Sequence, residues 1–167
     1  YGYLADMLGK KEVAEKYTQK AKDLAAEWVK MADDGDHYRL TFDKPGTWSQ
    51  KYNLVWDKLL NLQIFPKNVA ETEIAYYLSK QNKYGLPLDN RETYTKTDWI
   101  MWTATLADDK ATFEKFIEPV YLFMNVTPNR VPMSDWVFTD EPNQRGFQAR
   151  SVVGGYFIKM LEGKLIK

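Results

Sequence analysis

The fold is decided by residues 11–32, which read KEVAEKYTQKAKDLAAEWVKMA. Apolar side chains recur in this stretch at intervals of three and four residues, which is the spacing of neighbours on one face of an α-helix. That stripe consists of Val13, Tyr17, Ala21, Leu24, Trp28 and Met31. The opposite face carries Lys, Glu, Gln and Asp. The stretch therefore predicts one long amphipathic helix with a single apolar stripe.

The flanking sequence extends this pattern into helical hairpins. Leu4, Met7 and Leu8 are at helical spacing, and Gly9 suits the position just past a helix end, so a short helix pairs with residues 11–32. Similar spacing predicts helices over about 49–62, 67–83, 97–107 and 147–162, and from Asp108 or Asp109 through Met124. Strand signals are weak. We predict an all-α fold, a single domain over residues 1–167 whose helical hairpins stack as in a solenoid or a closed toroid.

Three segments interrupt the helical pattern. Pro119 lies inside a predicted helix, and because its ring clashes with the carbonyl four residues back, we expect a kink or a split there. Residues 127–146 contain three prolines and predict a long loop, which its apolar residues predict to be ordered. Residues 33–36 read DDGD and predict a turn, and their acidic pattern stops too early for an EF-hand calcium loop.

The composition argues against several classes of function. The 23 basic and 23 acidic residues cancel, so nothing favours a nucleic acid or an anionic membrane as partner. No apolar run approaches the roughly 20 residues of a membrane span. The chain has no cysteine and one histidine, His37, which removes thiol nucleophiles, cysteine zinc sites and paired-histidine motifs. We expect no metal and no cofactor, and a Ser-His-Asp triad is disfavoured because His37 lies in an acidic loop.

The candidate catalytic groups are carboxylates. Asp57, Asp89, Asp98 and Asp135 each lie within or beside an aromatic-rich stretch. Apolar surroundings raise the pKa of a carboxyl group and make it a usable acid or base near neutral pH. In stacked hairpins the long loops collect at one end, where such groups can converge on a pocket. The alternative for each aspartate is a helix cap or a structural ion pair.

Arginines are the candidate binding groups, because the guanidinium fork suits the carboxylate of an amino acid. The candidates are Arg91, Arg130, Arg145 and Arg150. The alternative is that they pair with carboxylates within the fold. Gly154 and Gly155 lack the lysine and the strand-to-helix context of a phosphate loop, so we interpret them as small residues that permit close helix packing.

Several motifs resemble one known family. They are GTWSQKYN at 46–53, VWD at 55–57, YGLPLD at 84–89 with Arg91, YTK at 94–96, DW at 98–99, PMSDW at 132–136 and GFQARSVVGG at 146–155. Together they resemble the glutaminase A family from Leu4 to about Leu161. The resemblance implies an α/α toroid of the six-hairpin, glycosidase-like type that follows β-rich domains, so this chain would be the C-terminal part of a larger multidomain protein. It also implies an extracellular or periplasmic location.

The activity that the resemblance implies is hydrolysis of L-glutamine to L-glutamate and ammonia. The substrate would then be a small amino acid. Asp98 or Asp135 would activate water or protonate the leaving ammonia, and Arg91 or Arg150 would hold the substrate carboxylate. The other residues that we assign to substrate binding are Tyr94, Trp99, Trp136 and Gln148.

Two alternatives belong to other classes of function. The six tryptophans and the glycosidase-like architecture suggest a toroid segment that binds or acts on glycans, for which Trp48, Trp99 or Trp136 should be exposed in a groove. A helical scaffold for a protein partner predicts a polar surface without clustered, perturbed carboxylates. An opened ring also exposes an apolar flank, so we expect the isolated chain to self-associate.

Overall fold

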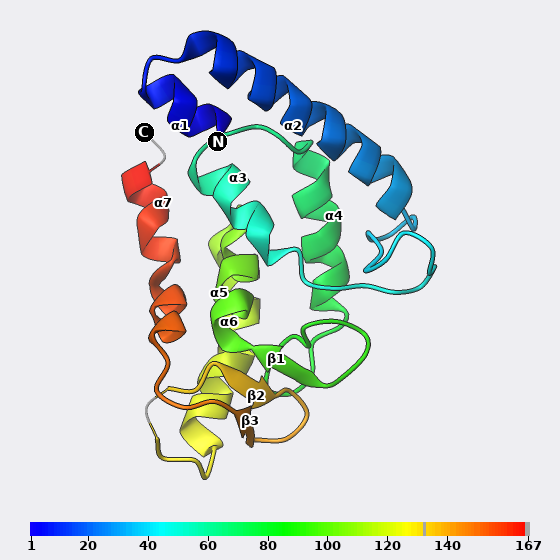
Figure 1. The fold of residues 1–167 in the computed structure, drawn as a ribbon. Helices are drawn as coiled ribbons and strands as arrows, with labels where there is room; N and C mark the ends of the chain where they lie inside the picture. The colour runs from blue at the N-terminus through cyan, green and yellow to red at the C-terminus, as the bar shows by residue number, and fades with distance from the viewer. Residues whose placement is uncertain (132, 166–167) are drawn as a thin grey trace.

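The computed structural model describes residues 1–131 and 133–165, and this part of the chain is mostly helical (Figure 1). The α-helices are α1 (Gly2–Met7), α2 (Lys11–Ala32), α3 (Val55–Leu59), α4 (Lys67–Leu78), α5 (Thr97–Thr105), α6 (Lys110–Val126) and α7 (Lys159–Leu165). Two 3₁₀ helices, η1 (Tyr52–Leu54) and η2 (Ser151–Phe157), precede α3 and α7. From α3 onward, successive helices run in opposite directions, which confirms the prediction of helical hairpins. No helix in the described ranges is long and apolar enough to span a bilayer.

The first hairpin is α1 with α2. Gly9 has a φ of 71°, a left-handed conformation that glycine adopts without steric cost, and it ends α1 as predicted. The apolar stripe of α2 is only partly covered, because Tyr17, Leu24 and Met31 remain 42%, 55% and 50% exposed. Val13, Ala21 and Trp28 are half-buried, and Trp28 packs against Tyr38 with ring centroids 5.1 Å apart.

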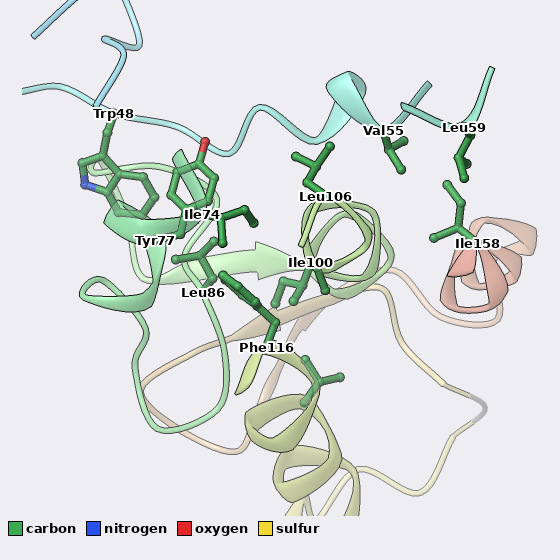
Figure 2. Close-up of a cluster of buried hydrophobic side chains, with 12 residues drawn as sticks. Trp48, Val55, Leu59, Ile74, Tyr77, Leu86, Ile100, Leu106, Phe116 and Ile158 are labelled. Atoms are coloured by element: carbon green, nitrogen blue, oxygen red, sulfur yellow. The ribbon is translucent and has the colours of Figure 1, made fainter. Parts of the chain in front are cut away.

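The main hydrophobic core is built around α5. Ile100 and Ala104 on this helix are fully buried, and Phe116 and Val120 of α6 pack in the same region. Figure 2 shows that the side chains of this cluster come from segments far apart in the sequence, from Trp48 before η1 to Ile158 before α7. The burial of α5 therefore fixes its first turn, which carries Asp98, in the middle of the fold.

Helix α6 runs without interruption through Pro119, so the split expected there does not occur. Proline removes the hydrogen bond to the carbonyl four residues earlier, which belongs to Lys115. The Gln81 side chain donates to that carbonyl at 3.0 Å and replaces the missing bond. At the start of the helix, the Asp109 carboxylate accepts the Thr112 N–H at 2.8 Å and caps the helix, which confirms the helix start predicted at Asp108 or Asp109.

A small antiparallel sheet occupies part of the segment that we predicted to be a loop. Its strands are β1 (Tyr94–Lys96), β2 (Trp136–Phe138) and β3 (Gln144–Gly146), in the order β1-β2-β3. Tyr94 lies opposite Phe138, and Lys96 lies opposite Trp136. The expectation that 127–146 has no regular structure was therefore wrong. Strands of three residues are too short to show the alternation that marks a strand in a sequence.

Two predicted helices are shorter than expected. The helix predicted over 49–62 is only η1 and α3, because the Gln50 side chain is held outside it. Its Nε2 donates to the carbonyls of Leu86 and Pro87 at 3.1 and 3.0 Å, and its Oε1 accepts the Thr103 hydroxyl at 3.0 Å. The helix predicted over 147–162 is split into η2 and α7.

The long connections meet at one end of the hairpins, as predicted (Figure 1). The connection that follows α2 pairs with the connection that follows α4. Ser49 forms a β-bridge with Asp89, and the Gln50 N–H donates to the Leu88 carbonyl at 2.9 Å. The connection that follows α4 pairs in turn with the connection that follows α6. They pair through β1 and β2, and the Tyr84 N–H donates to the Thr139 carbonyl at 2.8 Å. This end of the molecule holds the candidate site.

Candidate functional site

Asp98 lies in the first turn of α5, directly after β1, and is 5% exposed. Its Oδ1 is buried and has no hydrogen-bond partner within the described part of the protein. Burial raises the pKa of Asp98 to about 6, and the neighbouring Asp135 carboxylate adds to the effect. Backbone N–H groups of the first helical turn and Lys96 oppose it. Asp98 is thus a carboxyl group that exchanges a proton near neutral pH.

Asp135 lies just before β2 and is 1% exposed. Its carboxylate accepts from Lys96 Nζ at 3.1 Å and Arg150 Nε at 3.2 Å, and Arg150 Nη2 forms a second, short contact with it. Burial raises the pKa of Asp135, but the hydrogen bonds from Arg150 and Lys96 outweigh burial and keep the pKa below its ordinary value. Two neighbouring carboxyl groups therefore have their pKa values shifted in opposite directions, which is typical of acid–base pairs.

The wall next to this pair is formed by η2. A Cβ added at Gly155 would lie 2.9 Å from both the Asp98 Cβ and the Trp102 Nε1, whereas one at Gly154 would meet nothing within 4 Å. The predicted close-packing role is thus confirmed for Gly155 but not for Gly154. Tyr156 follows, and its hydroxyl donates to the Ser134 carbonyl at 3.4 Å.

Aromatic and cationic side chains cover the outer side of Asp135. The ring of Trp136 stacks on Phe147 with centroids 5.1 Å apart, and Lys96 Nζ lies 4.4 Å from the Trp136 ring centroid. Tyr94 meets the edge of Trp136 at 5.6 Å. Tyr94 and Trp136 are thus beside the carboxylate pair as predicted, but Trp136 packs against protein groups rather than standing free in a groove. Trp48, the third tryptophan proposed for a glycan platform, is buried.

A cleft of about 580 Å³ holds two more of the predicted residues, although neither Asp98 nor Asp135 lines it. Trp99 lines it and stacks on Tyr52 at 4.2 Å. Arg91, whose side chain is 66% exposed, also lines it, and its Nε and Nη2 contact the Asp89 carboxylate at 3.0 and 2.7 Å. Tyr52 links the cleft to Asp98, because burial and then the Asp98 charge raise the pKa of its hydroxyl.

The structure brings most of the predicted site residues to this region, with two qualifications. Arg150 is bound to Asp135, so its guanidinium is not free for a substrate carboxylate in this arrangement. Gln148 is exposed, in the segment between β3 and η2.

Sequence reasoning missed three residues beside the pair, namely Lys96, Trp102 and Tyr156. Lys96 was visible two residues before Asp98, but a lysine alone gives no signal of its partner. In the described ranges, no three His, Asp or Glu side chains gather in a way that could hold a metal ion.

The fold and the site together define a class of protein. It is an all-α domain of helical hairpins with paired carboxyl groups where the long connections meet. The chain belongs to the Glutaminase A six helical-hairpin domain family, whose model matches residues 1–160. It is 30% identical to glutaminase A of Aspergillus oryzae, in an alignment covering 95% of this chain and 24% of that protein. It is 29% identical to a probable glutaminase of Arthroderma benhamiae, over 74% of this chain and 18% of that protein. No solved structure matches the chain significantly.

The family assignment confirms the resemblance found in the motifs and the prediction of a helical-hairpin fold. The chain spans about a quarter or less of the length of these two curated relatives. The names glutaminase A and probable glutaminase describe those two relatives.

Proposed function

We propose that this chain is the C-terminal part of a larger glutaminase, an amide hydrolase that converts L-glutamine to L-glutamate and ammonia, acting outside the cell or in the periplasm. The observation that supports this most strongly is the asymmetry of the two neighbouring carboxyl groups. Asp98 has a pKa of about 6, whereas the pKa of Asp135 is lowered by Arg150 and Lys96 after burial has raised it. A helical scaffold for a protein partner would not need such a pair.

In the proposed reaction, water adds to the side-chain amide carbon and the C–N bond breaks. The ionised form of Asp98 takes a proton from the attacking water and then delivers it to the departing nitrogen, which leaves as ammonia. Asp135 keeps its charge throughout, which favours the protonated form of Asp98 and so its role as an acid.

Substrate binding is assigned to the cleft of Trp99 and Arg91. The exposed Arg91 guanidinium is held by Asp89 through Nε and Nη2, and its remaining nitrogen, Nη1, would receive the α-carboxylate at the cleft edge. Arg150 is reassigned from the substrate to a positioning role, because it holds Asp135. Tyr94 and Gln148 remain candidates for additional hydrogen bonds to the substrate.

The test is ammonia release from L-glutamine by the full-length protein that contains this chain. We expect Asp98→Asn to abolish turnover, because the amide neither accepts nor donates the proton. We expect Asp135→Asn to reduce turnover by about 10²-fold, because loss of its charge lowers the pKa of Asp98 and weakens Asp98 as the general acid. Asp109→Asn is the matched control, since it changes an exposed cap to another good capping residue. Unchanged turnover in Asp98→Asn would refute the assignment.

A glycan ligand is the second candidate, and the cleft lining favours it. Trp28, Trp56 and Trp99 all line the same cleft, as sugar platforms require. A glycan array with the full-length protein distinguishes the two functions. Glycan binding together with no ammonia release from glutamine would replace the first proposal by the second.

A further inference from the structure

A second, smaller pocket lies at the end of α6 and has no part in the proposed function. Its volume is about 270 Å³, and it is formed by the last turn of α6, the segment that follows, β3 and η2. Phe123 and Thr127 in its wall are buried, whereas Asn129 and Arg130 are exposed. Buried side chains therefore form its floor and exposed polar side chains form its rim. Pockets for drug-sized ligands begin at about 300 Å³, so this one suits a ligand of amino-acid size.

Arg130 gives this pocket its charge. Of the four arginines proposed from the sequence, Arg91 is bound to Asp89 and Arg150 to Asp135. Arg130 forms no ion pair and no side-chain hydrogen bond with the residues that the structure describes. Among the described residues that line the pocket, it is also the only charged one. A guanidinium group without a partner at a pocket rim favours one anion, and its planar fork suits a carboxylate.

A second donor stands beside Arg130 in a fixed position. The Asn129 N–H donates to the Thr127 hydroxyl oxygen at 3.2 Å, and Asn129 Oδ1 accepts the Gln144 N–H of β3 at 3.0 Å. These two bonds turn the amide oxygen of Asn129 towards β3. Its NH₂ group has no hydrogen-bond partner in residues 1–131 and 133–165, so it can donate to the same carboxylate as Arg130.

The wall beside β3 supplies acceptors. The Ser134 hydroxyl donates its proton to the Phe147 carbonyl at 3.0 Å, which leaves the hydroxyl oxygen able to accept. Gln144 Nε2 donates to the same carbonyl at 2.6 Å, and Gln144 Oε1 is buried without a partner within the described ranges. Buried polar atoms in folded proteins nearly always have a partner. Because Ser134 and Gln144 both line the pocket, a ligand that carries an N–H group fits this wall.

We propose that this pocket binds a small carboxylate that has a single negative charge and an uncharged body with an N–H donor, such as a carboxamide. The carboxylate binds to Arg130 and to the Asn129 NH₂ group at the rim. The N–H group of the body donates to the wall of Ser134 and Gln144. A second carboxylate on the ligand would lose its hydration without gaining a cation, because the described lining holds no other charged group. The inference goes beyond the proposed function, since this pocket and the cleft of Trp99 share none of their described lining residues.

The first test compares three ligands with the same four-carbon skeleton, namely succinamide, succinamate and succinate, which carry no, one and two carboxylates. Binding to the full-length protein that contains this chain is measured by ligand-observed NMR titration. We expect succinamate to bind with a dissociation constant of about 1 mM, typical of so small a ligand. Succinamide should bind about tenfold more weakly, because it lacks the charge-assisted hydrogen bond to Arg130. Succinate should bind at least about threefold more weakly than succinamate, because its second charge has no partner. Equal affinities, or tighter binding of succinamide or succinate, would overturn the inference.

The second test places the binding at this pocket. Arg130→Gln removes the guanidinium group but keeps a polar side chain. Arg145→Gln is the matched control, because Arg145 is exposed and forms no ion pair in the described part of the chain, yet it lies over the Trp136 ring at 5.0 Å and does not line the pocket. We expect Arg130→Gln to weaken succinamate binding about tenfold and succinamide binding less than about twofold. Arg145→Gln should change neither. Equal effects of the two variants, or no effect of Arg130→Gln, would overturn the inference.

This outcome is independent of the glutaminase proposal, because it is measured as binding and not as ammonia release. Release of ammonia from L-glutamine without a preference for succinamate would overturn the pocket assignment alone. A preference for succinamate that depends on Arg130, in a protein that releases no ammonia, would support the pocket and refute only the glutaminase proposal.

Discussion

The raised pKa of Asp98 predicts that Asp98→Asn makes the protein more stable while removing its proposed activity. In the folded chain this carboxyl group keeps its proton up to about pH 6, whereas its ordinary pKa is 3.8. Between these values the folded state binds a proton that the unfolded state has released. The free energy of unfolding therefore falls as the pH rises through this window, and the full penalty applies above it. Asparagine is neutral at every pH and avoids the penalty.

The size of the effect follows from the same pKa values. The difference between 3.8 and about 6 corresponds to about 3 kcal/mol of stability at neutral pH. The pKa of about 6 already includes the opposing charge of Lys96, and solvent screening reduces the remaining effect, so we expect about 2 kcal/mol. For a domain of this size, that raises the melting temperature by about 4–8 °C. Below about pH 4 the wild type and Asp98→Asn should melt together, because both side chains are then neutral.

The assay is scanning calorimetry of the full-length protein between about pH 2 and about pH 8, following the transition that Asp98→Asn changes. Asp89→Asn is a control of opposite sign. Burial raises the pKa of Asp89, but hydrogen bonds from Arg91 outweigh burial and lower it, so its ionised form stabilises the fold. Asp89→Asn should therefore destabilise the protein above its lowered pKa, and the effect should vanish as the pH falls through it. A pH-independent effect of Asp98→Asn, or a loss of stability at pH 8, would refute the reasoning.

Three further predictions concern the fold. The isolated chain should self-associate through the exposed stripe of α2, and a clean monomer in sedimentation velocity would contradict this. Tyr77→Phe should cost about 2–3 kcal/mol in denaturant unfolding, because the Tyr77 hydroxyl accepts the Lys51 N–H at 2.8 Å and has the buried Glu73 carboxylate and the Ser49 carbonyl as acceptors for its single proton. Pro119→Ala should change the stability by less than about 1 kcal/mol in the same assay, because Gln81 already bonds to the Lys115 carbonyl; a gain of about 3 kcal/mol would show that Gln81 does not replace the missing backbone bond.

The sequence predicted the long helices well because each carries a complete local signal. Residues 11–32 fill six turns with one unbroken apolar stripe, and α2 has those same limits. Gly9 and Asp109 mark helix ends through backbone rules that need no tertiary contact. The prediction of stacked hairpins followed from these elements alone.

The elements that were mispredicted depend on distant partners. The segment beginning at Gln50 has a helical pattern, but the Gln50 side chain bonds to carbonyls more than thirty residues away and holds the backbone outside the helix. Strand β2 exists because β1 and β3 lie on either side of it, and its three residues carry no periodicity of their own. At Pro119 the local rule predicted a break, and the contact from Gln81 removed the need for one.

The candidate site, like the fold, was only partly predictable from the sequence. Asp98 and Asp135 could be chosen from the sequence because their aromatic surroundings were visible. What the sequence could not give was which of the two would hold a proton, because that depends on Arg150 and Lys96 both reaching Asp135 and neither bonding to the buried oxygen of Asp98.

The acid–base asymmetry of the site is therefore a property of the assembled connections rather than of α5 alone. Lys96 comes from β1 and Arg150 from the segment after β3, and they meet at Asp135 across 39 and 15 residues of sequence. The Thr97 N–H also donates to the Asp135 carbonyl at 2.8 Å, which ties the start of α5 to the connection that follows α6. Loosening β2 would separate Asp135 from its two cations and at the same time move away the charge that, after burial, adds to the raised pKa of Asp98. Changes in the sheet should consequently alter the titration of a carboxyl group that lies outside it.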